Sequence, residues 1–334
     1  MPGVPAPDLG PLGPLTVDPA VTDVLVNGPA EVWVDRGDGL VRTDVRFPDE
    51  STVRALAVRL AATAGRRLDA AAPFADVRLP DGNRLHAVLP PVAPGGTCLS
   101  IRLLSARRFR LDDLERRGTF PASTTAVLRD VVAARLAVLV SGGTGTGKTT
   151  MLGALLGTVA ATERIVLVED TAELAVDHPH VVRLEGRSAN IEGSGAVPLR
   201  QLVRQALRMR PDRPVVGEVR GPEVLALLVA LNTGHEGGMA TVHANSVADV
   251  PARLEALGAL AGLDRAAVHA QVAAAVDVVL HLARRRDGVR VLDGLAVVRR
   301  ARDGALHLHP LDPAAPARDP AFPVLADLLE RRGR

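Results

Sequence analysis

A glycine-rich stretch in the middle of this sequence carries residue types that can bind phosphate. It fits the spacing G-x-x-x-x-G-K-[ST] between Gly142 and Thr149, after an apolar run at 137–140 and before a helical pattern at 151–160. Glycines permit positive φ angles and allow backbone N–H groups to approach phosphate oxygens closely. The order strand, glycine loop and helix therefore predicts a nucleoside triphosphate site, rather than a glycine-rich turn that merely precedes a helix.

Each residue type in the loop has an expected role. The Lys148 ammonium should reach the β- and γ-phosphates, and the Thr149 hydroxyl should bind Mg²⁺. The expected nucleotide-binding residues are Gly142, Gly143, Thr144, Gly145, Thr146, Gly147, Lys148, Thr149 and Thr150.

Two acidic residues end apolar runs downstream of the loop. Glu218 follows the run 213–217, and Glu169 follows the run 165–168. Nucleotide hydrolases keep an acid at such a strand end to hold Mg²⁺ or to activate water, so Glu218 is a candidate catalytic and metal-binding residue. Glu169 belongs at the same edge of a parallel sheet and is a second candidate for this work. The alternative for both is a solvated acid, and the sequence leaves open which of the two is the base.

A histidine completes the set of candidate catalytic residues. His243 follows a short β run and would end a strand beside the two acids, where it could contact the γ-phosphate; the alternative is a satisfied structural histidine. The pair His235-Glu236 begins a zinc-protease pattern, but Met239 stands where the second histidine of H-E-x-x-H belongs. Zinc-protease chemistry is therefore excluded here.

Composition restricts the class of protein further. The 334 residues are 47% hydrophobic, and 40 basic residues balance 38 acidic ones, so nucleic acid is not an expected partner on charge. Aromatic residues make up only 2%, which disfavours a protein that stacks single-stranded bases. Cys98 is the single cysteine, so an internal disulfide is impossible. We find neither an 18-residue apolar run nor a signal-peptide pattern, and we expect a cytoplasmic location.

Periodicity predicts two domains. Residues 1–20 are rich in Pro and Gly and are predicted to lack fixed structure. Short strands around one helix at 50–65 predict a small α+β domain at 21–105, followed by a linker at 106–121. Strands and helices alternate over 122–303, which predicts an α/β domain with a mainly parallel sheet. Residues 304–334 are expected to form a Pro-rich tail that ends in a short helix at 322–332. Asp293-Gly294 is predicted to join a hairpin of strands at 289–292 and 295–299.

Taken together, these motifs resemble one family, the hexameric secretion ATPases of type II and type IV secretion and of pilus assembly. The matching stretches, in order, are 142–149, 163–173, 209–221 and 232–246. Within that family the chain is similar to the Tad/Flp pilus branch (CpaF- or TadA-like) at 81–91, 100–102, 180–185 and 206–212. The tetracysteine zinc element of type II pilus-extension ATPases is missing, which disfavours that branch.

The resemblance implies more than the residues alone do. It implies a RecA-like P-loop ATPase domain, Mg-ATP bound between the two domains, and a hexameric ring. It implies that Arg84 and Arg102 reach the phosphates across the cleft between the domains. It also implies inner-membrane platform proteins as partners and a position at the inner face of the cell membrane.

We therefore expect an ATP-hydrolysing hexameric motor for Tad/Flp pilus assembly, protein secretion or conjugal transfer. The alternative is a RecA-like DNA helicase or DNA-packaging motor. Its support is a predicted helix that places Arg200, Arg204 and Arg208 on one face, although a solvated face explains that spacing as well. A third reading is a scaffold that binds ATP without hydrolysing it, which the acidic residues argue against. A GTPase is disfavoured because residues 232–235 do not form an N-K-x-D base reader.

Overall fold

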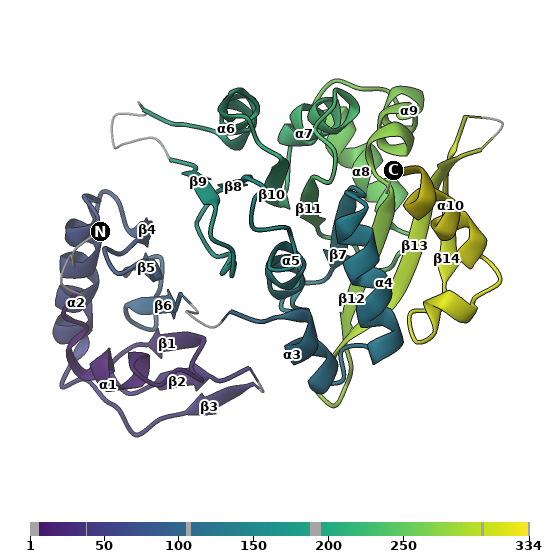
Figure 1. The fold of residues 1–334 in the computed structure, drawn as a ribbon. Helices are drawn as coiled ribbons and strands as arrows, with labels where there is room; N and C mark the ends of the chain where they lie inside the picture. The colour runs from purple at the N-terminus through teal and green to yellow at the C-terminus, as the bar shows by residue number, and fades with distance from the viewer. Residues whose placement is uncertain (1–6, 38, 105–107, 188–194, 302–303, 333–334) are drawn as a thin grey trace. The chain divides into compact units, whose positions relative to one another are not determined.

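The chain divides into two compact units (Figure 1). The computed structural model describes residues 7–37, 39–104, 108–187, 195–301 and 304–332. The first unit spans residues 1–106 with 189–195, and the second spans 107–188 with 196–334.

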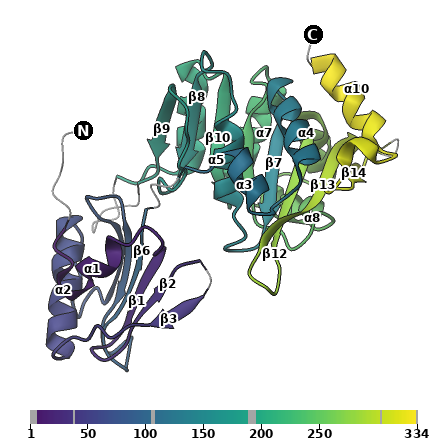
Figure 2. The ribbon, with the colours of Figure 1, turned by 60° about the horizontal axis from the view of Figure 1, so that its bottom comes forward.

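The first unit is an antiparallel sheet covered on one face by a helix. Its strand order is β3-β2-β1-β6-β5-β4. Helix α2 begins after Asp49, whose side chain accepts the Thr52 N–H and so caps a free donor of the first turn. Alternate strand residues pack against α2, and Figure 2 shows the helix along one side of this sheet. The bounds are β1 (Asp23–Asn27), β2 (Val32–Asp35), β3 (Leu40–Arg42), α2 (Glu50–Thr63), β4 (Phe74–Arg78), β5 (Arg84–Val88) and β6 (Cys98–Arg102).

The N-terminal stretch differs from its prediction where the structure describes it. Residues Gly10–Leu12 form a 3₁₀ turn, and α1 (Gly13–Thr16) follows. Leu9 and Leu12 are buried in the core of the first unit. Two leucines are enough to anchor the segment, because burying one leucine side chain contributes roughly 1.5–3 kcal/mol. Residues 1–6 lie outside the described residues.

The second unit is built on an eight-stranded sheet of order β14-β13-β12-β7-β11-β10-β8-β9. The strands from β12 to β9 in this order are parallel, and β13 and β14 add an antiparallel edge. The mainly parallel α/β architecture predicted from the sequence is confirmed. The bounds are β7 (Val138–Gly142), β8 (Ile165–Glu169), β9 (Val181–Glu185), β10 (Arg213–Val219), β11 (Met239–Val242), β12 (Val278–Arg284), β13 (Arg290–Arg300) and β14 (Leu306–Leu311).

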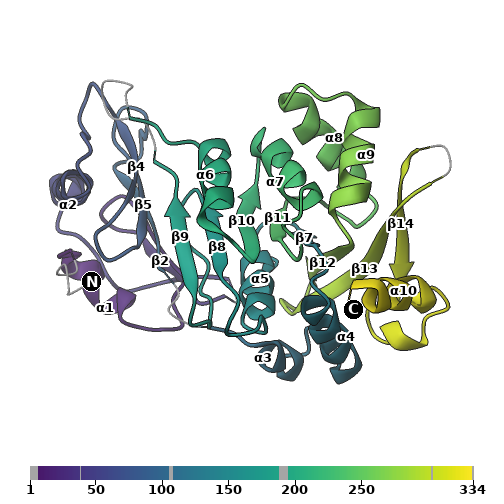
Figure 3. The ribbon, with the colours of Figure 1, turned by 45° about the horizontal axis from the view of Figure 1, so that its top comes forward.

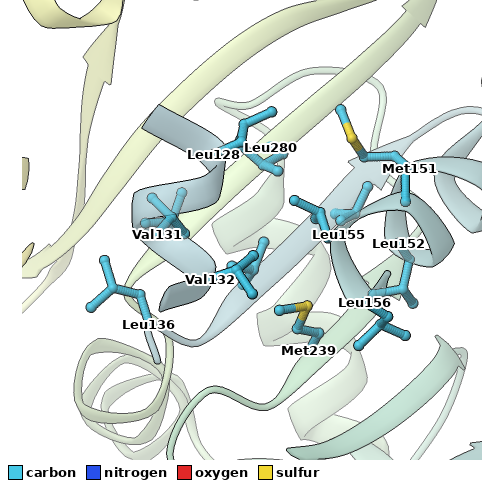
Figure 4. Packing of buried hydrophobic residues seen from close by; sticks show 14 of the residues in the cluster. Leu128, Val131, Val132, Leu136, Met151, Leu152, Leu155, Leu156, Met239 and Leu280 are labelled. Carbon is cyan, nitrogen blue, oxygen red and sulfur yellow. The ribbon is translucent and has the colours of Figure 1, made fainter. Parts of the chain in front are cut away.

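Helices cover both faces of this sheet. Side chains of α3, α4, α5 and α10 form a core on one face, and those of α6 to α9 form a core on the other (Figure 3). Strand β7 serves both cores, since Val138 and Val140 face the first and Leu139 the second. Figure 4 shows α4 and α5 side chains such as Val132 and Leu155 in the first core. The bounds are α3 (Leu111–Arg116), α4 (Ala122–Ala133), α5 (Lys148–Leu156), α6 (Leu199–Ala206), α7 (Glu223–Asn232), α8 (Val250–Leu260), α9 (Arg265–Ala275) and α10 (Phe322–Arg332).

The C-terminal part corrects two predictions. Asp293 and Gly294 lie inside the continuous strand β13, so the predicted hairpin at this pair is wrong. The turn between antiparallel neighbours instead joins β12 to β13, where Gly288 has φ +86°. The expected tail also supplies a strand that was not predicted, β14, which pairs with β13, while its predicted helix at 322–332 is present as α10 and packs on the core. Within the described ranges, no helix combines the length and the apolar character needed to cross a membrane.

Candidate functional site

The predicted phosphate loop connects the central strand β7 to α5. Gly142 has φ +150°, and a Cβ there would lie 2.5 Å from the Leu282 carbonyl oxygen of β12. Gly145 and Gly147 also have positive φ angles, of 72° and 96°. Glycine is therefore required for the backbone shape of the loop, which leaves the N–H groups of the first α5 turn free for an anion.

Lys148 is held inside the loop by the loop itself. Its side chain is 8% exposed, and Nζ donates a 2.8 Å hydrogen bond to the Gly143 carbonyl. Nζ also lies 3.3 Å from Nδ1 of His243. Burial lowers the pKa of Lys148, Arg220 lowers it further, and the negative charge of Glu218 opposes both. Lys148 therefore supplies a desolvated cation at the expected place for phosphate.

His243 and Glu218 extend this contact away from the loop. Nε2 of His243 lies 2.5 Å from Oε1 of Glu218, and Oε2 of Glu218 forms an ion pair with Arg220. Burial and the neighbouring Lys148 lower the pKa of His243, so its ring is neutral at pH 7. A neutral ring that accepts from Lys148 at Nδ1 carries its proton at Nε2, on the Glu218 side.

One oxygen of Glu218 remains available. Oε1 is buried and makes no well-formed hydrogen bond to a described residue, although Nε2 of His243 lies against it. The Thr149 hydroxyl also makes no hydrogen bond to any described residue. Mg²⁺ is usually held by one or two protein oxygens together with phosphates and water, so this donor set fits it. Within the described residues, no group of three or more His, Cys, Asp or Glu forms a separate metal site.

Glu169 lies apart from this chain of contacts. Its Oε1 accepts the backbone N–H groups of Glu173 and Leu174 at 3.0 and 2.9 Å, and its Oε2 pairs with Arg183 at 3.1 Å. Burial raises the pKa of Glu169, while these three donors act against that rise. Glu169 also packs across Gly217, where a Cβ would lie 2.7 Å from its Cγ. Its oxygens thus fix the loop that follows β8.

Arg84 and Arg102 lie side by side on the uncovered face of the first unit. They are direct partners on β5 and β6, and Arg78 of β4 extends the row. Arg84 makes two hydrogen bonds to Asp76, at 2.9 and 2.6 Å, and Arg102 contacts Asp23 at 3.1 Å. The structure brings these two arginines together, and their predicted role at the phosphates stays a prediction.

The β12–β13 hairpin contributes residues that sequence reasoning missed. Arg290 Nε donates a 2.9 Å hydrogen bond to the Gly145 carbonyl of the loop. His281 is buried, and its Nδ1 lies 2.9 Å from the Ser141 hydroxyl oxygen. Arg220, the partner of Glu218, was also missed. Its position two residues after the acid was the one local signal available, whereas the hairpin residues lie about 140 positions from the loop.

The arginine face predicted on a helix lies on α6 and the turn after it. Arg200, Arg204, Arg208 and Arg210 are exposed, and none of them makes an ion pair or a side-chain hydrogen bond with a described residue. Leu199, Leu202, Val203 and Ala206 bury the opposite face. The helix therefore presents a row of unpaired positive charge.

Comparison with known proteins connects this site to a family. The profile of the family described as "Type II/IV secretion system protein" matches residues 6–292. A putative conjugal transfer protein of Mycobacterium tuberculosis is 60% identical over 298 residues, which cover 87% of this chain and 85% of the relative. VirB11 of Agrobacterium fabrum is 33% identical over 256 residues, covering 68% of this chain and 73% of that protein.

A solved structure supports the fold. The pilus retraction motor PilT, determined with bound ADP, matches with a TM-score of 0.60 at 21% identity and covers 95% of this chain and 88% of that one. At this identity the match speaks for the arrangement of elements, which is that of a RecA-like ATPase domain after a smaller N-terminal domain. The extensive profile match and the conjugal-transfer relatives settle the identification, and the chain belongs to the type II/IV secretion ATPase family.

Proposed function

We propose that this protein hydrolyses Mg-ATP and works as a hexameric motor of a secretion, conjugal transfer or pilus assembly system. The observation that carries the proposal is the chain of contacts Lys148–His243–Glu218 beside a glycine loop shaped for phosphate. A cation and a carboxylate beside a phosphate loop are parts that recur in phosphoryl-transfer sites, and this supports the proposal.

Each residue of the site has a definite part in the proposed reaction. Lys148 leaves the Gly143 carbonyl and binds the phosphates. Thr149 and Glu218 hold Mg²⁺, which when bound neutralises negative charge on the phosphate oxygens. Glu218, through its free Oε1, orients the attacking water and accepts its proton, and His243 contacts the γ-phosphate. Glu169 is given a positioning part, because its oxygens already have three donors.

The first unit would complete the site through its arginine row. Arg84 and Arg102 are exposed enough to exchange their carboxylate partners for phosphate oxygens, and arginines aimed at developing phosphate charge increase rates by about 10³-fold or more. Movement of this unit on nucleotide exchange would convert hydrolysis into mechanical work. The proposed partners are inner-membrane platform proteins, with the motor at the inner face of the membrane.

Two observations bear on which kind of secretion system this motor would serve. The Mycobacterium tuberculosis relative and TrbB from Sinorhizobium fredii, which is 33% identical over 84% of this chain, are both named as conjugal transfer proteins. Sequence stretches at 81–91 and 206–212 favour the Tad/Flp pilus branch. Both machines would need the same ATPase cycle, and the cycle is what we test first.

The test is Mg-ATP turnover per protomer, measured as phosphate release over a range of protein concentrations, with molecular mass followed in parallel. We expect the rate per protomer to rise and saturate as hexamers form. A rate that stays constant while the mass changes from monomer to hexamer would refute completion of the site by assembly. If assembled rings bind ATP without releasing phosphate, the hydrolysing motor is refuted and the ATP-gated scaffold is favoured.

A DNA-translocating motor is the second candidate because of the unpaired arginine row on α6. Arginines at i, i+4 and i+8 present evenly spaced positive charge that suits a phosphate backbone. Stimulation of turnover by DNA, with a steep decrease at rising salt, would favour this candidate. The variant Arg204→Glu should then remove the stimulation while basal turnover is unchanged.

A further inference from the structure

A buried histidine, His281, lies between the strand that precedes the phosphate loop and the segment that carries His243. His281 lies in β12 with 3% of its surface exposed. Its Nδ1 is 2.9 Å from the hydroxyl oxygen of Ser141, the residue directly before the glycine loop. The backbone of Asn245, two residues after His243, acts on the same ring and raises its pKa. One side chain therefore touches both the phosphate-loop strand and the segment that carries His243.

The register of the sheet makes this arrangement specific. Ser141 of β7 is paired with His281 of β12 on one side and with Val242 of β11 on the other. The residues that follow Ser141 and Val242 are Gly142 and His243, so the loop and the catalytic histidine leave the sheet from adjacent positions. Any shift of β7 relative to the end of β11 moves His243 relative to Lys148.

The surroundings of His281 determine the protonation state of its ring. The Asn245 contact raises the pKa of His281, as expected when a ring N–H donates to a backbone carbonyl, while burial lowers that pKa more strongly. The ring is therefore neutral, and its Nδ1 shares a hydrogen bond with the Ser141 hydroxyl. The Ser141 hydroxyl has a second acceptor at 3.4 Å, the Leu280 carbonyl, and the shorter contact is to the ring.

The charged groups around His281 support the same state. Asp293 of β13 and Asp249 before α8 raise its pKa, and Lys148 at the start of α5 lowers it. Neither aspartate forms a direct ion pair with the ring. Burial thus dominates, and the neutral ring keeps one donor and one acceptor at pH 7.

Side-chain packing also restrains the segment that follows His243, residues 243–249. Gly294 of β13 is the direct partner of His281, and a Cβ on Gly294 would lie 2.2 Å from Cγ2 of Val247 and 3.3 Å from Cβ of His281. Val247 therefore fills the space that a side chain at position 294 would need. Residues 243–249 are thus held against the β12–β13 hairpin by the packing of Val247 beside Gly294 and His281.

We propose that His281 is a positioning residue that keeps His243 in register with the phosphate loop, so that Lys148, His243 and Glu218 act as one unit. The proposal rests on the ATPase function proposed above. His281 touches no nucleotide in it and acts through Ser141 and Asn245. Loss of the ring should therefore affect the rate of hydrolysis much more than nucleotide binding.

The experiment compares His281→Leu with His281→Gln, each in the wild-type chain and in the chain carrying His243→Ala. Leucine keeps the volume but removes the hydrogen bond to Ser141 and the polar ring, whereas glutamine keeps a neutral donor and acceptor. Loss of the buried hydrogen bond to Ser141, at about 1.4 kcal/mol, predicts that His281→Leu lowers kcat about tenfold, with KM for ATP changed less than about threefold. His281→Gln should restore most of kcat, and His281→Leu should have less than about a threefold further effect in the His243→Ala chain.

Other outcomes overturn the proposal. Equal losses with leucine and glutamine, a change confined to KM, or a full tenfold loss on top of His243→Ala would each contradict coupling through His243. If His281→Leu does not fold, Ser141→Ala replaces it, because it removes only the hydroxyl donor; it should lower kcat several-fold with the same dependence on His243.

A readout without turnover separates this inference from the proposed function. We expect the amides of residues 243–249 to exchange hydrogen faster in nucleotide-free His281→Leu than in His281→Gln or the wild-type chain. Unchanged exchange in these amides refutes the positioning role even if the wild-type protein hydrolyses ATP. Faster exchange in a protein that never hydrolyses ATP refutes the ATPase while the link between the two segments stands.

Discussion

Replacing Glu218 with Gln tests the central residue of the proposed reaction. The side chain keeps its volume, but it can no longer accept a proton from water. A general base contributes about 10²- to 10⁴-fold in rate, and tenfold corresponds to about 1.4 kcal/mol, so the barrier should rise by about 3 to 5 kcal/mol. We expect kcat, measured by phosphate release, to decrease by that factor.

Nucleotide binding and folding should be almost unchanged in Glu218→Gln. Lys148 keeps its contact with the loop, and the glutamine carbonyl oxygen can still bind Mg²⁺ in place of the carboxylate oxygen. The lost ion pair is with Arg220, whose side chain is 54% exposed, and such pairs contribute less than about 1 kcal/mol. Binding of a fluorescent ATP analogue and chemical denaturation measure these two expectations.

Glu169→Gln is the matched control. Glutamine can still accept the two backbone N–H groups at Oε1, but its amide would face Arg183, so we expect a loss of about 1–3 kcal/mol in stability and at most about a tenfold loss of kcat. If Glu169→Gln abolishes turnover in a folded protein while Glu218→Gln stays within threefold of wild type, the assignment of the base is reversed and the reasoning from free oxygens is refuted.

Three further outcomes are expected. Arg84→Ala should lower kcat by about 10³-fold at concentrations where turnover per protomer has saturated, and an unchanged rate would show that Arg84 is not at the phosphates. Gly237→Ala should destabilise the protein by about 3 kcal/mol or more in chemical denaturation, because its Cβ would lie 2.1 Å from Nη1 of the buried Arg213; Gly65→Ala has a similar φ but no atom within 4 Å and should cost only about 1–2 kcal/mol. Burial lowers the pKa of His281 from 6.5, so the unfolded chain binds more protons just below that pH. The contribution of His281 to the free energy of unfolding should therefore be fully present above about pH 6.5. It should decrease as the pH falls below that value, by at most about 1.4 kcal/mol per pH unit, and His281→Gln should remove this pH dependence.

The phosphate loop could be predicted because its signal is local. Strand, loop glycines, Lys148 and helix follow one another directly, and each residue type obeys a rule about its own neighbours. The choice between Glu218 and Glu169 could not be made in this way. It depends on which oxygens already have donors, and the donors to Glu169 come from a loop whose path no periodicity describes.

The errors at the C-terminus have a related cause. Asp293-Gly294 has the composition of a tight turn, yet Gly294 is needed in a strand because Val247 occupies the space beside it. His281 had no motif of its own, since its partners Ser141 and Asn245 belong to other segments. Tertiary contacts, rather than local propensity, decided the structure at these positions.

The place of β7 in the sheet has a consequence for synthesis on the ribosome. Both neighbours of β7, namely β11 and β12, follow it in the chain, and the His281 contact to Ser141 spans 140 residues. A nascent chain that ends before β12 therefore contains the whole phosphate loop but has an unpaired edge on its central strand. Such an edge readily pairs with other chains, so the growing polypeptide is most exposed to aggregation after its nucleotide motif has emerged and before residue 284 has.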